Sequence, residues 1–214
     1  MNMTSTASTT IDELLRQRKD PTCLRIGVAG GSGSGKSTVC ELIRTKLTAC
    51  AVEVIALDRF FKPLDQLPKY DSQYHQAQPP DFNTPDSLLV EEMIAYCRQL
   101  SLTGILIYDG HLALYYPQMR TLMDIKCFVD CDITQMLERR TTRNLAIGYG
   151  GDRENILAYN RECVVPRYEQ FIQPTSRFAD IMIPNSSKHV EERNALIDLL
   201  CEKISQQDGF NTRP

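Results

Sequence analysis

Residues 30–37 of the sequence read Gly-Gly-Ser-Gly-Ser-Gly-Lys-Ser, which matches the G-x-x-x-x-G-K-[ST] pattern of phosphate-binding loops. Glycines at these places let the backbone approach a polyphosphate, and the free N–H groups at a helix start favour an anion. In this pattern the lysine reaches the β- and γ-phosphates and the serine hydroxyl binds Mg²⁺. We therefore expect a nucleoside triphosphate, ATP or GTP, at Gly30, Gly31, Ser32, Gly33, Ser34, Gly35, Lys36, Ser37 and Thr38.

The residues on both sides of this loop support that interpretation. The apolar run 26–29 before it is typical of a buried strand, and apolar residues recur at helical spacing after it, up to about residue 48. The alternative is a Gly/Ser-rich turn that merely joins a strand to a helix. The complete motif between a strand and a helix favours a binding site, with Lys36 also catalytic.

Two aspartates follow other apolar runs and have side chains suited to phosphoryl transfer. Such a transfer needs a carboxylate to orient or accept the acceptor's proton, and metal and cations to stabilise the moving group. Asp58 ends the run 52–57 and suits the acceptor side; Asp109 ends the run 104–108 and suits Mg²⁺. The alternative for each is an ordinary turn aspartate.

An arginine cluster and a glycine-rich segment come later in the chain. Arg139, Arg140 and Arg143 lie within about one helical turn of one another, just before the loop 147–151. Such a cluster beside a mobile loop suits a lid that closes over phosphates. The alternative is a solvated basic helix end favoured by the helix dipole. His111 could act as an acid or base, although a lone histidine is more often structural.

These residues must be positioned by elements that alternate between strand and helix patterns. We expect an α/β fold, a P-loop NTPase-type parallel sheet of about five strands with helices on both faces. In such sheets ligands gather at the carboxyl ends of the strands. The expected strands are 26–29, 52–57, 104–108, 127–130 and 179–183, and the expected helices are 10–18, 38–48, 88–100, 133–143, 152–171 and 190–205.

Some element boundaries are predicted from capping and breaking residues. The segment 10–13, Thr-Ile-Asp-Glu, has the capping-box pattern and should open the first helix. Asp86 or Ser87 should cap the helix that follows it. The further expectations are that Asp130 and Asp132 cap the helix from 133, that Pro166 kinks or divides the helix 152–171, and that residues 64–84 are irregular.

The length of 214 residues suits one domain of moderate size. We expect an N-terminal tail and short helix at 1–20, with a disordered start at 1–10. A kinase-type domain at 21–206 would carry a lid near 139–153, and a C-terminal tail would span 207–214.

The composition excludes several classes of protein. The net charge of −3 gives no field for nucleic acid or an anionic membrane. No apolar run approaches the length of a membrane span or a signal-peptide core, and cytosol is the expected location. The eight cysteines form no C-x-x-C pair, so we expect reduced, packed thiols rather than zinc or disulfides.

Taken together, the motifs resemble the uridine kinase family, within the uridine kinase–phosphoribulokinase group. The similarity runs from about residue 24 to 204. The segments that carry it are Ile26–Ser37, Asp58–Phe61, Asp81–Ser87, Asp109–Leu112, Leu122–Asp130, Tyr168–Pro174 and Phe178–Pro184.

The resemblance implies ATP- or GTP-dependent phosphorylation of a nucleoside's 5′-hydroxyl. It would make Asp58 the general base and place Phe61 at the substrate. It would put Ser37 and Asp109 on the metal side, with Mg²⁺ as the cofactor, and Arg139 and Arg143 at phosphates or the lid. It further implies a small-molecule substrate that Arg143 contacts in addition to the nucleotide. The nucleotide base would lie near the loop after Pro184, and the family includes homo-oligomers.

The sequence also departs from the family pattern. The segment 101–104 stands where the family carries a hairpin that embraces the pyrimidine base, and 147–150 replaces Glu-Arg-Gly-Arg in the lid. The family usually has glutamate at the position of Asp109 and a substrate-side glutamine at Ala158. The leading hypothesis is a uridine/cytidine kinase-like phosphotransferase.

Two alternatives stay open. The first is a nicotinamide riboside kinase or another small-molecule kinase. Nicotinamide riboside kinases share an Asp-x-Phe-Phe-Lys-Pro segment and an Arg-Arg-x-Thr-Arg-like lid start, which are similar to 58–63 and 139–143. The second is a nucleotide-binding protein with little transferase activity. A GTPase or ATPase switch is weaker because the guanine-binding Asn-Lys-x-Asp segment does not occur.

Overall fold

A sheet of five parallel strands lies at the centre of the computed structural model, which describes residues 3–75, 77–207 and 210. The strand order is β2-β3-β1-β4-β5, and every pairing is parallel. This confirms the predicted α/β class with a sheet of five strands. The strand bounds are β1 Cys23–Ala29, β2 Val52–Ala56, β3 Gly104–Asp109, β4 Ile125–Asp130 and β5 Ile181–Pro184.

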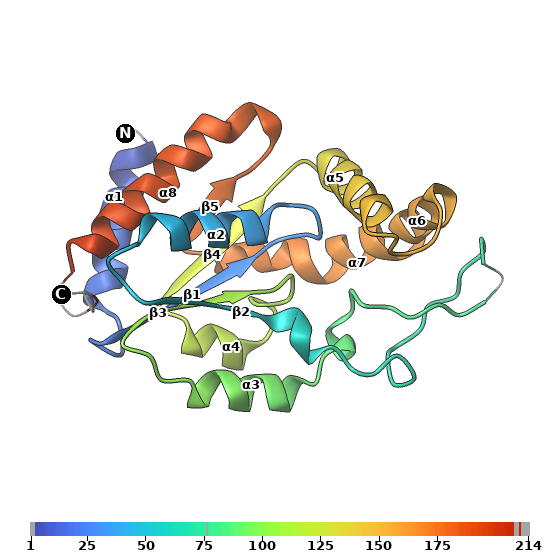
Figure 1. The fold of residues 1–214 in the computed structure, drawn as a ribbon, viewed down its shortest axis with the longest axis horizontal. Helices are drawn as coiled ribbons and strands as arrows, with labels where there is room; N and C mark the ends of the chain where they lie inside the picture. The colour runs from blue at the N-terminus through green and yellow to red at the C-terminus, as the bar shows by residue number, and fades with distance from the viewer. Residues whose placement is uncertain (1–2, 76, 208–209, 211–214) are drawn as a thin grey trace.

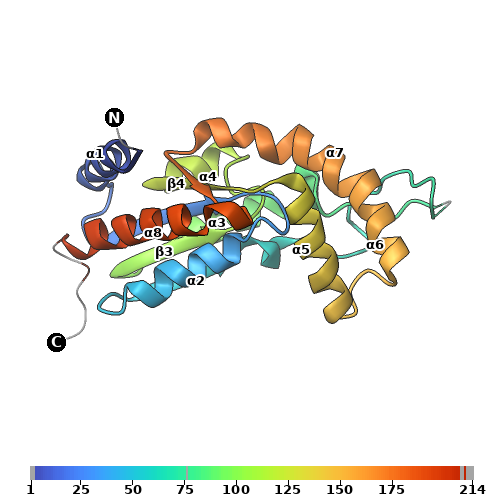
Figure 2. The same cartoon turned by 90° about the horizontal axis from the view of Figure 1, so that it is seen from above.

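Helices cover both faces of this sheet (Figure 1). Helices α1, α2 and α8 lie on one face and α3 and α4 on the other, while α5, α6 and α7 extend beyond the carboxyl ends of the strands (Figure 2). The helix bounds are α1 Met3–Arg16, α2 Lys36–Lys46, α3 Val90–Gln99, α4 Pro117–Leu122, α5 Ile133–Ala146, α6 Arg153–Tyr159, α7 Val165–Arg167 and α8 Val190–Ser205.

Apolar side chains from both faces of the sheet form two cores. One core lies under α1, α2 and α8, and the other under α3 and α4. Every residue of β3 is buried, and six of the seven residues of β1 are. Strands buried on both faces appear in the sequence as continuous apolar runs, which is why they were predictable.

The first helix begins earlier than the capping pattern predicts. It starts at Met3, and the Thr10 hydroxyl donates within the helix to the carbonyl of Thr6 at 3.0 Å instead of capping its start. The expected disordered start is therefore wrong for residues 3–10. Ile11 and Leu15 are fully buried where α1 packs on α8, so tertiary contact stabilises this helix.

A second predicted cap, at Asp86 or Ser87, is wrong, and a third, at Asp132, is confirmed in its position only. A 3₁₀ turn, Pro85–Ser87, precedes α3, and the Ser87 hydroxyl donates to the carbonyl of Phe82 rather than to the helix. Asp132 holds the N-cap position of α5 without a side-chain bond to its backbone, and Asp130 ends β4. Asp152, in contrast, caps α6 by accepting the N–H of Asn155.

The segment that contains Pro166 does not break. Two π-helical turns, Asn160–Val164 and Tyr168–Ile172, flank the short α7, and a 3₁₀ turn, Gln173–Phe178, follows. Proline lacks an N–H and crowds the preceding turn, so wide turns accommodate it within one helical path. Pro166 was expected to kink or divide the helix; instead, the helix continues and changes between α and π turns around it.

The chain between β2 and α3 is irregular, as predicted. Residues 64–84, which we call the strap, contain neither helix nor strand over the described positions 64–75 and 77–84, only isolated bridges between Lys69 and Pro80 and between Ser72 and Ala77. The tail predicted at 207–214 lies outside the described residues except for Gln207 and Phe210. All eight cysteines are buried free thiols, as expected. Among the described residues, no helix combines the length and apolar character that a membrane crossing requires.

The packing of α1 gives a stability prediction. Leu15→Ala should lower the free energy of unfolding by about 2–4 kcal/mol, because it leaves a cavity against α8. Urea unfolding measures this change. Leu64→Ala is the matched control, since Leu64 is 69% exposed and its truncation should cost less than about 0.5 kcal/mol. Equal stability of the two variants would show that α1 does not pack on the core.

Candidate active site

The Gly/Ser-rich loop lies between β1 and α2, at the carboxyl edge of the sheet. Gly33 and Gly35 have φ of +89° and +95°, in the left-handed region that favours glycine. A Cβ on Gly33 would stand 2.2 Å from the carbonyl oxygen of Met136, and one on Gly35 would stand 2.1 Å from Asn185 Nδ2. Glycine is therefore required at both positions, because α5 packs closely against Gly33 and the loop after β5 packs closely against Gly35.

The charged and hydroxyl groups of the motif lie at the start of α2. Lys36 Nζ donates to the carbonyl of Gly31 at 3.1 Å, so its ammonium folds back over the loop. The Ser37 hydroxyl donates to Asp109 Oδ2 at 2.6 Å. This contact follows from the sheet, because β1 and β3 are neighbours in which Val28 pairs with Asp109. The two residues that the sequence placed on the metal side are thus brought together.

This pair has the donor chemistry that Mg²⁺ prefers. Ser37 offers a hydroxyl and Asp109 a carboxylate, both hard oxygen ligands. In the part of the chain that the structure describes, no three His, Cys, Asp or Glu side chains form a metal cluster. Magnesium usually binds through one or two carboxylates together with water and substrate phosphates, so the residues present fit it.

Asp58 lies on the same edge, in the 3₁₀ turn Leu57–Phe60 that ends β2. Its Oδ1 is 3.6 Å from Nδ1 of His111, and its side chain is 65% exposed. Partial desolvation by the surrounding chain would by itself raise the pKa of this carboxyl, but the contact with His111 and the positive charges of Lys36 and Arg143 outweigh it, so the pKa lies below its ordinary value. Asp58 is therefore ionised at neutral pH.

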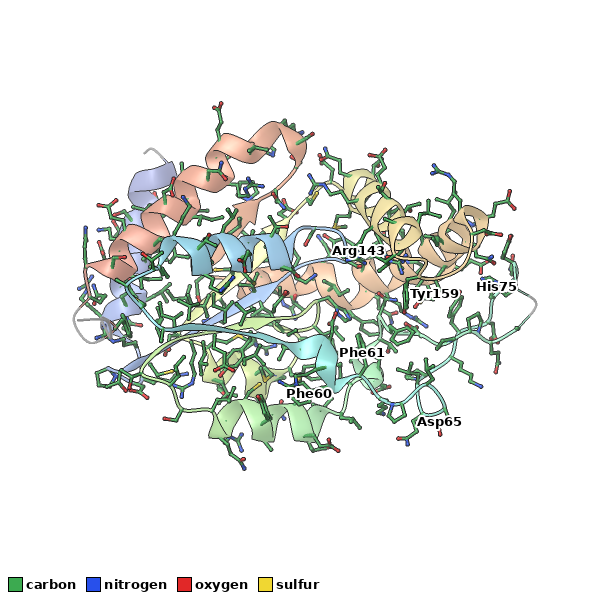
Figure 3. The ribbon with its side chains drawn as sticks, in the orientation of Figure 1. Phe60, Phe61, Asp65, His75, Arg143 and Tyr159 are labelled. Atoms are coloured by element: carbon green, nitrogen blue, oxygen red, sulfur yellow. The ribbon has the colours of Figure 1, made fainter. Side chains whose placement is uncertain are left out.

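An aromatic group adjoins Asp58. The Phe61 ring stacks on His111 with centroids 5.9 Å apart, and meets Phe82 edge-on at 5.2 Å (Phe61 is labelled in Figure 3). His111 is buried, and its Nε2 has no hydrogen-bond partner in the described structure. The histidine that the sequence left undecided thus contacts the expected base.

The three arginines of α5 have different surroundings. Arg143 reaches the loop, with its Nη2 3.5 Å from the Ser32 hydroxyl (Figure 3). Arg139 donates to the carbonyl of Asn185 at 3.0 Å, beside Cys131. Arg140 is buried, donates to Asn160 Oδ1 and lies over the Tyr159 ring at 5.2 Å. Of the three, Arg143 is the one whose side chain hydrogen-bonds to the phosphate-binding loop within the described part of the chain.

The glycine-rich segment links α5 to α6. Gly148, Gly150 and Gly151 all have positive φ, in the region that favours glycine, and nothing lies within 4 Å of a Cβ built on Gly148. Ile147 and Tyr149 are exposed there. Gly148 and Gly150 stand where the resemblance would place the two arginines of the lid pattern.

The strap is held against the end of α6 and against α7. The Tyr159 hydroxyl is 3.1 Å from Asn83 Nδ2 and 3.3 Å from the carbonyl of Pro80. Arg167 forms a 2.8 Å ion pair with the buried Asp81. Tyr159 (labelled in Figure 3) therefore joins the strap to the end of α6, a role that its sequence neighbours do not reveal.

A glycine-lysine-serine loop after the central strand of a parallel sheet, with its serine bonded to an aspartate of the next strand, defines a P-loop nucleoside triphosphate-binding domain. The sequence specifies the family more closely. Residues 65–191 match the model of the phosphoribulokinase / uridine kinase family, and this chain belongs to that family.

Curated relatives agree with this assignment. Uridine-cytidine kinase B of Dictyostelium discoideum is 30% identical over 86% of this chain and 84% of its own length. Uridine kinase of Limosilactobacillus reuteri (strain DSM 20016) is 31% identical over 89% of this chain and 93% of its own length. Other relatives are longer: this chain spans 41% of uridine-cytidine kinase A of Dictyostelium discoideum, at 32% identity over 88% of this chain.

Solved structures share the fold. One is described as a possible uridine kinase from Bacillus stearothermophilus; it has 15% identity, a TM-score of 0.51, and covers 83% of this chain and 97% of its own. Another is shikimate kinase from Acinetobacter baumannii in complex with shikimate, with 17% identity, a TM-score of 0.50, and coverage of 87% and 93%. At these identities the likeness is one of fold.

The loop geometry gives a prediction about nucleotide affinity. Gly33→Ala should weaken ATP binding by about tenfold or more, because its Cβ would collide with the Met136 carbonyl and displace the loop. Isothermal titration calorimetry without any acceptor measures the Kd. Gly104→Ala is the matched control: its φ is also positive, at +145°, and its Cβ would lie 2.3 Å from the carbonyl oxygen of Ala51, but at the amino end of β3, on the edge of the sheet opposite the loop. Equal Kd values for both variants would contradict this account of the loop.

Proposed function

We propose that this protein is an ATP-dependent phosphotransferase that phosphorylates a hydroxyl group of a small metabolite, with a ribonucleoside 5′-hydroxyl as the acceptor. The observation that carries the proposal is the position of Asp58, which lies in the turn after β2, on the same sheet edge as the phosphate-binding loop. A nucleotide-binding module that transferred nothing would have little use for a carboxylate at that place.

The donor side uses the loop and its surroundings. The N–H groups of Gly30–Thr38 bind the phosphates of ATP or GTP, with Lys36 on the β- and γ-phosphates. Arg143 extends this positive field from α5, and Arg139 contributes from the side of the loop after β5. The segment 139–153 acts as the lid, hinged at the glycines of 148–151.

The acceptor side centres on Asp58. This carboxylate takes the proton of the acceptor hydroxyl while the hydroxyl oxygen bonds to the γ-phosphorus. The bond between that phosphorus and the β–γ bridging oxygen breaks at the same time, and ADP is released. Lys36 stabilises the charge that develops on the moving group. Ser37 and Asp109 would hold a magnesium ion, which supplies charge neutralisation at the phosphates.

The nucleoside acceptor is supported by two observations. The curated relatives are uridine and uridine-cytidine kinases over most of this chain. Beside Asp58, the stacked rings of Phe61 and His111 offer an aromatic wall suited to a planar or ribose-bearing group.

A nicotinamide riboside kinase, or another small-molecule kinase, is the second candidate. The chain passes from the end of α3 at Gln99 to the start of β3 at Gly104 without room for a base-binding hairpin. The segments 58–63 and 139–143 resemble those of nicotinamide riboside kinases. A nucleotide-binding protein with little transferase activity is the alternative from another class, favoured by glycines at 148 and 150 in place of the lid arginines and by the missing hairpin.

Asp58→Asn tests the catalytic assignment. The isosteric amide cannot accept the acceptor's proton, so transfer to uridine, cytidine or nicotinamide riboside should fall by about 10²–10⁴-fold. The Kd for MgATP should stay within about twofold of the wild-type value, since Asp58 lies on the acceptor side and its substitution removes no phosphate contact.

The control for this substitution is Asp65→Asn, on the exposed part of the strap (Asp65 is labelled in Figure 3), which should leave both transfer and affinity unchanged. Full transfer by the Asp58→Asn variant would remove Asp58 from the role of base.

A further inference from the structure

Asn185, the first residue after β5, lies where three elements meet the phosphate-binding loop. It is buried, and its backbone N–H donates to the carbonyl of Asp130 at 2.7 Å. Its side-chain Nδ2 donates to the carbonyl of Ser34, inside the loop, at 2.6 Å. Its own carbonyl accepts from Arg139 of α5, and its Oδ1 accepts from Arg193 of α8 at 2.8 Å.

The contact with Arg193 determines which way the Asn185 amide points. A guanidinium can only donate hydrogen bonds, so the atom that faces it must be the amide oxygen. The amide nitrogen is then directed at Ser34, whose carbonyl can only accept. Arg193 and Ser34 together leave one orientation for this side chain.

That orientation fixes a peptide plane in the loop. The peptide between Ser34 and Gly35 is trans, so the carbonyl of Ser34 and the N–H of Gly35 point in opposite directions. With the carbonyl held by Asn185, the N–H of Gly35 is directed away from Asn185. It donates to no backbone carbonyl in the described part of the chain, so it is free to bind an anion.

A glycine with φ of +95° would otherwise make this peptide easy to rotate. Rotation by half a turn would present the carbonyl oxygen of Ser34 to the phosphates and withdraw the N–H of Gly35. An oxygen in that place repels a polyphosphate, whereas an N–H attracts it. Phosphate binding is therefore favoured when a group outside the loop holds the Ser34–Gly35 peptide in one orientation.

We infer that Asn185 is a positioning residue that locks the Ser34–Gly35 peptide with its N–H toward the nucleotide phosphates, and that Arg193 sets the orientation of its amide. The inference rests on nucleotide binding at the loop and is independent of the acceptor and of transfer. It assigns the loop after β5 a function in phosphate binding.

The test is calorimetric binding of MgADP to the full chain without an acceptor. Asn185→Leu, which is close in size, and the smaller Asn185→Ala should each raise the Kd by about tenfold, because an unheld peptide populates the unproductive orientation. If the leucine variant does not fold, the alanine variant alone decides. A Kd unchanged from that of the wild type in folded Asn185→Ala protein would overturn the inference.

A control separates positioning from general loosening of the fold. Thr175 is also buried and donates one hydrogen bond, to the carbonyl of Ile172 at 2.6 Å, in the 3₁₀ turn before β5. Thr175→Val should lower the melting temperature without changing the Kd for MgADP. An equal loss of affinity in this variant and in Asn185→Ala would overturn the positioning role.

Arg193 supplies a second, independent measurement. Arg193→Gln should raise the Kd by about threefold, because the amide of Asn185 is no longer held in one orientation. Combined with Asn185→Ala, it should add nothing, since the group that it orients is gone. A full, additive effect in the double variant would overturn the orienting step. Failure of phosphoryl transfer would leave all of these binding results unaffected.

Discussion

The hydrogen bond between Ser37 and Asp109 depends on the parallel pairing of β1 with β3, and the rest of the site is arranged around it. In a parallel sheet all carboxyl ends meet at one edge, so the loop after β1, Asp58 after β2 and Asp109 after β3 lie together without further design. Because β1 is central, β4 and β5 bring α5 and Asn185 to the loop from the other side. An antiparallel partner for β1 would separate these groups.

The two halves of the site differ in how firmly they are held. The phosphate half is bound by short contacts between buried strands and by glycines that admit neighbouring atoms. The proposed acceptor half consists of irregular chain, in which the strap is held by Tyr159 and by the Asp81–Arg167 ion pair. This division agrees with membership of a family whose description joins two kinases named for different acceptors, since loops can change without disturbing the sheet.

The sequence predicts those features that depend on local pattern. The phosphate-binding loop is a contiguous motif, and the strands are apolar runs, so both were found with small errors in their bounds; β1, for example, begins at Cys23 rather than residue 26. It could not predict α1 from Met3, because burial against α8 rather than a cap stabilises that helix. Nor could it show that Asn185 contacts Ser34, because 151 positions separate them and only the sheet brings them together. Asp58 and Asp109 were selected because each comes at the end of an apolar run. Such positions can be recognised in the sequence without knowing which residues are in contact.

The measurement that tests the account most directly is ADP release from MgATP in the presence of a panel of acceptors: uridine, cytidine, nicotinamide riboside, pantothenate, and several sugars and sugar acids. The account predicts that one of the ribonucleosides stimulates turnover and gains a phosphate at its 5′-hydroxyl. Stimulation by uridine or cytidine would show that the core binds pyrimidine nucleosides without a hairpin, and stimulation by nicotinamide riboside would favour the second candidate. A protein that binds ATP tightly but releases no ADP with any member of the panel would contradict the proposed kinase.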